Sequence, residues 1–521
     1  MKTITIHPRD NVAVALEDIK AGEMIPASHG GLGEEDLMEA AQDIPRGHKI
    51  ALTDIKKGEE IIKYGCRIGI ATEDIPTGAH VHVHNVKTAL SEEADYVYEP
   101  VTYPLPDVSN RTATGSDPAN GDTLDGSTPT KSRTFMGYRR AKGKVGIRNE
   151  LWIIPTVGCV NSIAEKLARD NQDLVTGSIE GLYAFTHPFG CSQMGDDHAT
   201  TRKVLASLVR HPNAGGVLVL SLGCENLTEE QFKAELREWN GSRVKFLTCQ
   251  KSDDELADGR KLLEEIADFA SGFQREEIDA SELIVGMKCG GSDGLSGITA
   301  NPAVGRFSDR LIALGGSTVL TEVPEMFGAE SILFNRCKDT ETFNKAVAMV
   351  DNFKKYFVSH GQVVYENPSP GNKAGGITTL EDKSCGCVQK GGSAPVVDVL
   401  EYADPVTLKG LSLLSGPGND MVSATDLTAA GAHLILFTTG RGTPFGAPAP
   451  TVKISTNTAL YEKKGNWIDF NAGTVADGEE TLDEAGDRLL DYVLEVASGR
   501  KTRQEEKGYR EISIFKDGVT L

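Results

Sequence analysis

The stretch that decides the fold is GVLVLSLGCEN, residues 216–226. It is apolar for the length of a strand, and then it becomes polar around Gly223, Cys224 and Glu225. Strands that are buried on both faces of a parallel sheet have this composition, and functional groups gather at their carboxyl ends. The stretch therefore predicts a parallel α/β sheet with a polar site at one edge.

The same pattern recurs on both sides of this stretch. Apolar runs end at polar or glycine-rich loops at 151–155, at 283–288 before Cys289, at 317–321 before Glu322, and at 434–438 before Gly440-Arg441-Gly442. A helix-like stretch follows the first run at 162–168. Most of the chain is therefore expected to form two α/β domains with mostly parallel sheets, at residues 136–275 and 276–521.

The first 95 residues have a different pattern. Short strand-like runs alternate with turn signals, and the phrase Asp-Ile-x-x-Gly occurs at 18–22, 54–58 and 74–78. Such reuse of a turn predicts a compact β-clip unit over residues 1–95. Residues 96–135 are expected to be a flexible linker, because the part from Asp107 to Thr134 has almost no large apolar side chain.

Charge and cysteine usage exclude several classes of protein. The 521 residues carry a formal net charge of −21 and no dense basic stripe, so nucleic acid and anionic membranes are not expected partners. No apolar run reaches the roughly 18 residues of a membrane span, and the first residues lack a signal-peptide core. Nine cysteines without disulfide-like spacing then indicate a cytoplasmic protein with reduced thiols.

Histidines near residue 80 are candidate metal ligands. On an extended strand, His80, His82 and His84 would share one face, and His48 lies in a turn of the same unit. Imidazoles that reach a common point can ligate a divalent metal. The alternative is a solvated strand or a structural histidine cluster.

A second candidate is HPFGCSQMGDDH, residues 187–198, which holds Cys191 and His198. Cysteines at loop starts form a wider set with Cys159, Cys224 and Cys289. They could hold iron directly or as an iron–sulfur cluster. Each could equally be an ordinary buried thiol.

Two loops are candidate anion sites. One is NPSPGNKAGG, residues 367–376, where free backbone N–H groups and Lys373 could cradle a carboxylate. The other contains Arg441, whose guanidinium can clamp a carboxylate. Either could also be an ordered surface turn.

Taken together, these phrases resemble the altronate/galactarate dehydratases, hydro-lyases of hexuronate and aldarate breakdown. The resemblance covers nearly the whole chain and rests on residues 10–14, 46–49, 62–65, 191–198, 223–225, 289–293, 299–302, 367–373 and 439–444. The phrases at 80–85, 148–152, 191–198 and 321–330 look more like the altronate-dehydrating branch. The resemblance implies an N-terminal SAF domain of β-clip type and dependence on Fe²⁺ or Mn²⁺. It also implies conversion of D-altronate to 2-dehydro-3-deoxy-D-gluconate in galacturonate catabolism.

Dehydration of a 2,3-dihydroxy acid requires charge stabilisation, a base for the C2 proton and an acid for the 3-hydroxyl. We expect the metal ligands among His48, His80, His82, Cys191, Cys224, Glu225 and Cys289. The acid/base candidates are His198, Asp293, Glu322 and Glu325, and the candidates for binding the substrate are Asn372, Lys373 and Arg441. The expected partners are a small sugar acid and a second copy of the chain in a homo-oligomer, most simply a dimer. The alternatives are a dehydratase of galactarate or another sugar acid, and a sugar-acid-binding regulator built on a decayed enzyme.

Overall fold

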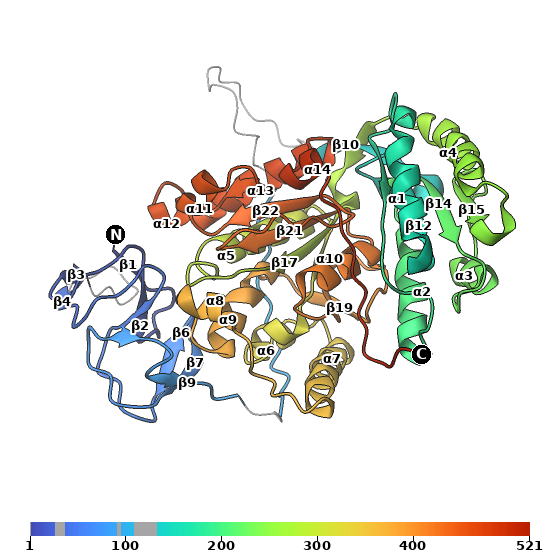
Figure 1. Ribbon diagram of the computed structural model, residues 1–521. Coiled ribbons are helices and arrows are strands. Elements are labelled where there is room, and N and C mark those ends of the chain that lie inside the picture. Colours follow the sequence, from blue (N-terminus) through green and yellow to red (C-terminus); the bar gives the residue numbers. More distant parts are fainter. Residues whose placement is uncertain (1, 27–36, 91–94, 109–132) are drawn as a thin grey trace, which may run out of the picture.

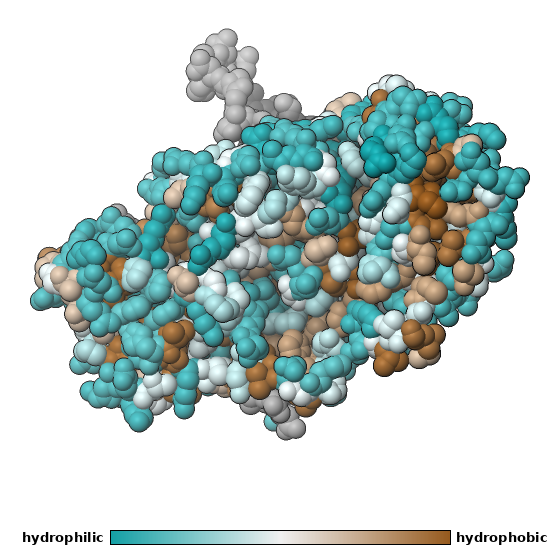
Figure 2. All heavy atoms as spheres, in the orientation of Figure 1, coloured by the Kyte–Doolittle hydropathy of each residue, from teal (hydrophilic) through white to brown (hydrophobic). Residues whose placement is uncertain are grey.

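The computed structural model describes residues 2–26, 37–90, 95–108 and 133–521 (Figure 1). It contains a small N-terminal β unit (residues 2–90), a second domain (133–279) and a C-terminal domain (280–521), and it confirms the predicted mixed α/β class. The central part of the predicted linker, 109–132, lies outside the described residues. None of the helices in the described ranges has the length and apolarity that crossing a membrane requires. The face in Figure 2 is mainly hydrophilic, with hydrophobic residues gathered mostly over the second domain.

The N-terminal unit is built from short strands. A four-stranded sheet has the order β1-β2-β5-β8, a three-stranded sheet has the order β6-β7-β9, and β3 pairs with β4. The bounds are β1 (Thr3–Ile4), β2 (Val12–Ala15), β3 (Met24–Pro26), β4 (Leu37–Glu39), β5 (Lys49–Ala51), β6 (Glu60–Lys63), β7 (Cys66–Ala71), β8 (His80–Val81) and β9 (Val86–Lys87).

The repeated turn phrase organises this unit. A fourth stretch, at 43–47, fits the same phrase in addition to the three copies named above. The copies associate in pairs, since Ile19 forms a bridge with Ile44, and Ile55 forms one with Ile75. Buried isoleucines thus hold two turns back to back, and the fourth turn leads directly into His48.

The second domain has a parallel four-stranded sheet in the order β13-β12-β14-β15. Alternate residues of β12 explain its two cores: Trp152 packs towards α2, and Leu151 packs towards α1 and α4. The elements are β12 (Glu150–Pro155), β13 (Gly181–Ala184), β14 (Ala214–Ser221), β15 (Val244–Thr248), α1 (Asn161–Asp170), α2 (Gly195–Arg210), α3 (Glu229–Leu236), α4 (Glu255–Ser271), and the 3-10 turns η1 (Ala141–Gly143), η2 (Gly158–Val160), η3 (Gln172–Leu174) and η4 (Cys249–Lys251).

The C-terminal domain contains a parallel seven-stranded sheet in the order β19-β20-β18-β17-β21-β22-β23. Helices α5 and α13 pack on one face and α10 on the other. The strands are β17 (Ile284–Cys289), β18 (Ser317–Leu320), β19 (Val396–Leu400), β20 (Gly410–Leu414), β21 (Leu434–Thr439), β22 (Thr451–Ser455) and β23 (Phe470–Asn471). The helices are α5 (Ala300–Ala313), α6 (Glu330–Phe334), α7 (Thr340–Ser359), α8 (Pro370–Ala374), α9 (Leu380–Cys387), α10 (Asp420–Ala429), α11 (Thr458–Lys463), α12 (Thr474–Asp477), α13 (Leu482–Ala497), α14 (Arg503–Lys507), η5 (Ala280–Glu282), η6 (Val323–Glu325) and η7 (Val388–Gly391).

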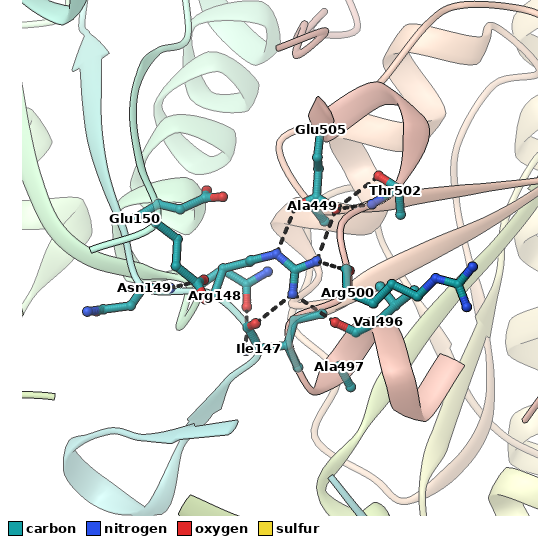
Figure 3. A network of polar contacts seen from close by, with 12 residues as sticks. Ile147, Arg148, Asn149, Glu150, Ala449, Val496, Ala497, Arg500, Thr502 and Glu505 are labelled. Atoms are coloured by element: carbon teal, nitrogen blue, oxygen red, sulfur yellow. Dashed lines mark hydrogen bonds and ion pairs between the residues drawn. The ribbon is translucent and has the colours of Figure 1, made fainter. Parts of the chain in front are cut away.

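A buried arginine joins the second and C-terminal domains (Figure 3). The Arg148 guanidinium donates to Glu505 at 2.7 and 3.0 Å and to the carbonyls of Val496 and Arg500 at 2.8 and 2.9 Å. A small antiparallel sheet of β10 (Thr134–Arg139), β11 (Val145–Gly146) and β16 (Glu276–Asp279) lies at the same junction. Since both partners of the ion pair are buried, the two domains are held at a fixed junction.

The N-terminal unit docks on the C-terminal domain through another buried ion cluster. Asp382 of α9 accepts from Lys49 at 2.8 Å and from Lys63 at 3.2 Å, and all three side chains are almost fully buried. The segment 95–108 also lies along this domain, where Tyr96 donates to Glu330 at 3.0 Å. The unit is therefore attached by specific contacts that fix its histidines against the C-terminal domain.

Candidate functional site

Three histidines of the N-terminal unit come together at its surface with the C-terminal domain. One nitrogen each of His48, His80 and His82 lie within 4.8 Å of one another. His48 Nδ1 is 2.9 Å from His80 Nε2, and the rings of His48 and His82 are 4.5 Å apart. These distances bring the predicted histidine ligands together.

Local structure explains their positions. His80 pairs with Ile50 in the sheet, which places it beside His48. The strand ends at Val81, and the Asn85 side chain holds the following turn by accepting from His82 N and donating to His80 O, both at 2.9 Å. His82 therefore folds back beside His80, whereas His84 is exposed.

Electrostatics favours the neutral imidazoles that metals require. Burial lowers the pKa of all three groups, to about 4 for His80 and about 3 for His82, with neighbouring positive charge contributing. His82 Nδ1 is also buried without a hydrogen-bond partner among the described residues. A neutral ring with an unused nitrogen suits ligation better than a structural hydrogen-bonding role.

The histidine cluster faces the end of helix α8. His48 Nε2 is 3.5 Å from the Ala374 carbonyl, and a Cβ at Gly47 would lie 3.0 Å from the Gly375 carbonyl. Gly47 also has a φ of +82°. The close approach and the left-handed backbone both explain why glycine precedes His48.

Asp293 lies against the same loop. Its carboxylate accepts from Ser296 Oγ at 3.0 Å and from Thr456 Oγ1 at 2.9 Å, and its Cβ would be 3.1 Å from a Cβ at Gly375. Burial raises the pKa of Asp293. The predicted acid/base residue is thus held beside the histidine-facing loop.

The three predicted substrate-binding residues have different environments. Arg441 is exposed and donates to the Gly371 carbonyl at 2.6 Å, and Lys373 is half-buried on α8. Asn372 is buried and caps the helix: it accepts from Ser369 N at 3.0 Å and donates to Ser292 O at 2.8 Å. Arg441 and Lys373 are therefore available cations, whereas the Asn372 side chain holds the loop.

A second cluster lies inside the C-terminal domain. Glu325 Oε2 is 2.9 Å from Cys289 Sγ and 3.1 Å from Cys387 Sγ, and the two sulfurs are 3.5 Å apart. Glu325 Oε1 accepts from Lys383 at 2.7 Å. Burial acts to raise the pKa of Glu325, but Lys383 and Lys390 lower it to about 2.

Glu322 and its lysine complete the polar interior. Lys288 donates to Glu322 at 2.7 Å and to Asp420 at 2.9 Å, while the other Glu322 oxygen accepts from Cys289 N at 2.8 Å. Glu322 has a φ of +73°, a rare conformation for a residue with a side chain. One oxygen accepts from the lysine and the other from the backbone of β17, so this carboxylate ties the ends of β17 and β18 together.

A cavity of about 830 Å³ opens beside this cluster, and its lining includes Cys289, Glu325, Asn372, Lys383 and Asp420. Cys387, Lys383 and Lys390 are not among the residues predicted from the sequence. Cys385 and Cys387 form a close pair in the sequence, but with one residue between them they do not match the usual spacing of zinc ligands. The helix α9 brings Cys387 to Cys289 from nearly a hundred positions away, which spacing alone does not reveal.

The remaining predicted residues lie in the second domain. Cys191 and Cys224 are exposed at the strand ends, and His198 is half-buried near the start of α2. Glu225 is buried and holds its own loop by accepting from Thr156 Oγ1 at 2.8 Å and Gly223 N at 2.6 Å. The predicted residues are thus divided among the histidine cluster with its facing loop, the buried cluster and the second-domain edge.

Comparisons with known proteins agree with this three-part chain. Family models match consecutively: the Altronate/galactarate dehydratase SAF domain at 1–89, the D-galactarate dehydratase/Altronate hydrolase second domain at 137–271, and the D-galactarate/Altronate dehydratase C-terminal domain at 280–520. The chain belongs to the D-galactarate/altronate dehydratase family. Its enzymatic class is that of a hydro-lyase, as predicted.

Relatives within the family align over nearly their full length. The chain is 52% identical to an altronate dehydratase of Bacillus subtilis, with 99% of both chains covered. It is 50% identical to an altronate dehydratase of Escherichia coli, with 100% of both covered. It is 34% identical to the galactarate dehydratase (L-threo-forming) of Escherichia coli, covering 98% of this chain and 96% of the relative.

Proposed function

We propose that this enzyme dehydrates D-altronate to 2-dehydro-3-deoxy-D-gluconate and water, as a step of galacturonate catabolism in the cytoplasm. The observation that carries the proposal is the identity of 50–52% to two altronate dehydratases, compared with 34% to a galactarate dehydratase. Both comparisons cover nearly whole chains, so the difference does not come from a missing domain. Galactarate is the second candidate substrate, and the homodimer stays a prediction.

The proposed cofactor is Fe²⁺, with Mn²⁺ as the alternative, held by His48, His80 and His82. Three imidazoles with lowered pKa values, one buried and two half-buried, fit a divalent ion of this kind. When bound, such an ion stabilises the negative charge that develops as the C2 proton leaves.

The other proposed roles belong to the loop that faces the histidines. Lys373 and Arg441 would orient the carboxylate of the sugar acid, because Lys373 is a half-buried cation on α8 and Arg441 is an exposed cation that contacts this helix. Asp293 would accept the C2 proton. Its raised pKa brings it closer to the working range of a general base than an exposed aspartate.

The test is anaerobic turnover of D-altronate and D-galactarate with metal-free enzyme and after addition of Fe²⁺ or Mn²⁺, following the 2-keto product. Metal-stimulated product from altronate alone is the expected result. Faster turnover of galactarate than of altronate would make galactarate the substrate in place of altronate. Absence of product from both acids would overturn the proposal. Asp293→Asn with Glu325→Gln as its comparison separates the two carboxylates: only the first should abolish proton exchange at C2.

A further inference from the structure

The second domain carries a set of thiols that the proposed reaction does not use. Its strands β13, β12 and β14 are neighbours in one parallel sheet. The loops that follow them carry Cys191, Cys159 and Cys224, and all three side chains are exposed and free. Adjacent parallel strands end at the same edge and are about 5 Å apart, so the topology brings the three loops that carry these thiols to one edge of the sheet.

Hydrogen bonds draw the first two loops together. Gly158 N, next to Cys159, donates to the Phe189 carbonyl at 2.8 Å, two positions before Cys191. Gly190 has a φ of +96°, and a Cβ there would collide with the Thr156 carbonyl. The loop carrying Cys191 is therefore pressed onto the loop carrying Cys159, and only glycine permits this approach.

The third loop is tied to the Cys191 loop by Asn226. Its Oδ1 accepts from Ser192 N at 2.8 Å and lies 3.5 Å from Cys191 Sγ. Asn226 is two positions after Cys224, whose sulfur accepts from Gln250 Nε2 at 3.3 Å. All three cysteines thus belong to one network of loops.

The surroundings of these loops suit an anionic group. Gln193 Nε2 and His198 Nε2 are buried and have no hydrogen-bond partner among the described residues. Gln193 is only 4% exposed, and its amide nitrogen can act only as a donor. Helix α2, sixteen residues long, begins at Gly195, but its first turn carries the carboxylates of Asp196 and Asp197, which offset the positive end of its dipole. The donor nitrogen of Gln193 is therefore the group that favours an anion here.

The spacing favours a cluster over a single ion. Among the described residues, the groups whose ligand atoms lie within 4.8 Å of one another are the three histidines and Cys289, Glu325 and Cys387. At least one pair of the three exposed thiols is therefore more than 4.8 Å apart, which is wide for the ligands of one ion and leaves room for a polynuclear centre. We propose that Cys159, Cys191 and Cys224 bind a [4Fe–4S] cluster, with no cysteine on its fourth iron.

The assembly balances without a net redox change. Equal numbers of ferrous and ferric ions combine with as many sulfides as irons, each thiol releases one proton to solvent, and three iron–thiolate bonds form. Cys249, which follows β15, is half-buried, and burial raises its pKa to about 11. It is therefore the matched control, being a strand-end cysteine of the same sheet that is not among the proposed ligands.

The test is anaerobic reconstitution of the full chain with equal ferrous and ferric iron and with sulfide, followed by desalting. Iron, acid-labile sulfide, the charge-transfer absorption and the electron paramagnetic resonance spectrum after reduction are measured. We expect about four labile sulfides per chain in the wild type and in Cys249→Ser, with about four irons in the cluster besides the iron that the histidines hold. Cys159→Ser, Cys191→Ser and Cys224→Ser should each lose most of the sulfide.

The outcomes separate this site from the histidine cluster. His82→Ala should keep the labile sulfide, since its ligand position lies in another domain. Wild-type protein without labile sulfide would overturn the proposal, and so would a sulfide content that Cys191→Ser leaves intact. Melting curves must show that each variant is folded, and Cys191→Ala provides a second replacement if serine disturbs the loop.

Discussion

The two parallel sheets place polar groups at their carboxyl ends, but the two edges differ in solvent exposure. In the C-terminal domain, Lys288, Glu322 and Cys289 are buried and paired with one another. In the second domain, Cys191 and Cys224 at the corresponding edge are exposed.

The cover over each edge explains this difference. The N-terminal unit docks on α9, and α9 carries Lys383 and Cys387 into the C-terminal cluster. Charges that are removed from water must be neutralised by partners, so this edge became a network of ion pairs. The C-terminal residues contact the second-domain edge, where Leu521 N donates to the Ser192 carbonyl at 2.9 Å, and the thiols at this edge are exposed in the described part of the chain. Polar groups thus gather at the carboxyl ends of the strands in both domains. They form a buried network of ion pairs in the C-terminal domain and an exposed set of thiols in the second domain.

The largest expected effect comes from removing the buried ion cluster that attaches the N-terminal unit to α9. Asp382→Asn leaves Lys49 and Lys63 buried without their carboxylate, and the expected loss is about 3–5 kcal/mol. Denaturant unfolding, with proteolysis at the N-terminal unit as a local probe, measures it. Asp74→Asn, in an exposed pair with Lys56, is the control and should leave both unchanged. Equal stability and equal proteolysis of the two variants would show that the buried cluster does not hold the N-terminal unit in place.

The next effect concerns the junction between the two sheets. Burial acts to raise the pKa of Glu505, but Arg148 beside it lowers the pKa to about 2. A depressed carboxyl pKa stabilises the fold above the unfolded pKa of about 4.3, by about 3 kcal/mol here, and this contribution is lost as pH falls towards 2. Glu505→Gln should therefore be less stable than wild type at pH 7, and the difference should shrink below pH 4. Urea midpoints across this range measure it, with exposed Glu506→Gln as the control; a constant difference at every pH would contradict the assignment.

A third prediction tests whether the histidine cluster is a ligand site and not packing. His82→Ala should weaken the binding of Fe²⁺ by more than the roughly 10- to 100-fold that outer-shell changes cost. His84→Ala, exposed and 5.3 Å from the His80 ring, should retain binding. Isothermal titration under anaerobic conditions compares them. Similar Fe²⁺ affinities in both variants would show that His82 is not a metal ligand.

Much of this comparison was predictable from the sequence. Runs such as 216–223 predict parallel strands, because their apolar composition requires cover on both faces. The same reasoning locates Cys224 and Cys289 at strand ends. It does not tell which end is covered, since that depends on Lys49 and Lys63 meeting Asp382 from more than three hundred positions away.

The histidines show the same limit at shorter range. Alternation predicts His80, His82 and His84 on one face, but the strand ends at Val81, and the turn that follows leaves His84 exposed. Cys387 is the opposite case, a residue of the buried cluster that the sequence did not predict. Its spacing from Cys385 gives no sign of its contact with Cys289, which only the tertiary fold creates. Local patterns thus identify the candidate residues, and long-range docking decides which of them meet.

The smallest expected effect concerns Arg441, on the exposed loop that follows β21. Arg441 is exposed and uses one nitrogen on the Gly371 carbonyl, so the rest of its planar fork can hold a carboxylate bidentately. Arg441→Lys keeps the charge but loses the fork, and KM for the sugar acid should rise by roughly fivefold, about 1 kcal/mol. The value of kcat should change little, because the carboxylate is held alike before and during the reaction. Steady-state kinetics measures both constants, with exposed Arg488→Lys as the control. A fall in kcat at constant KM would instead place Arg441 at the reacting carbons. The exposed loop that carries Arg441 would then take part in the reaction itself and not only in substrate binding.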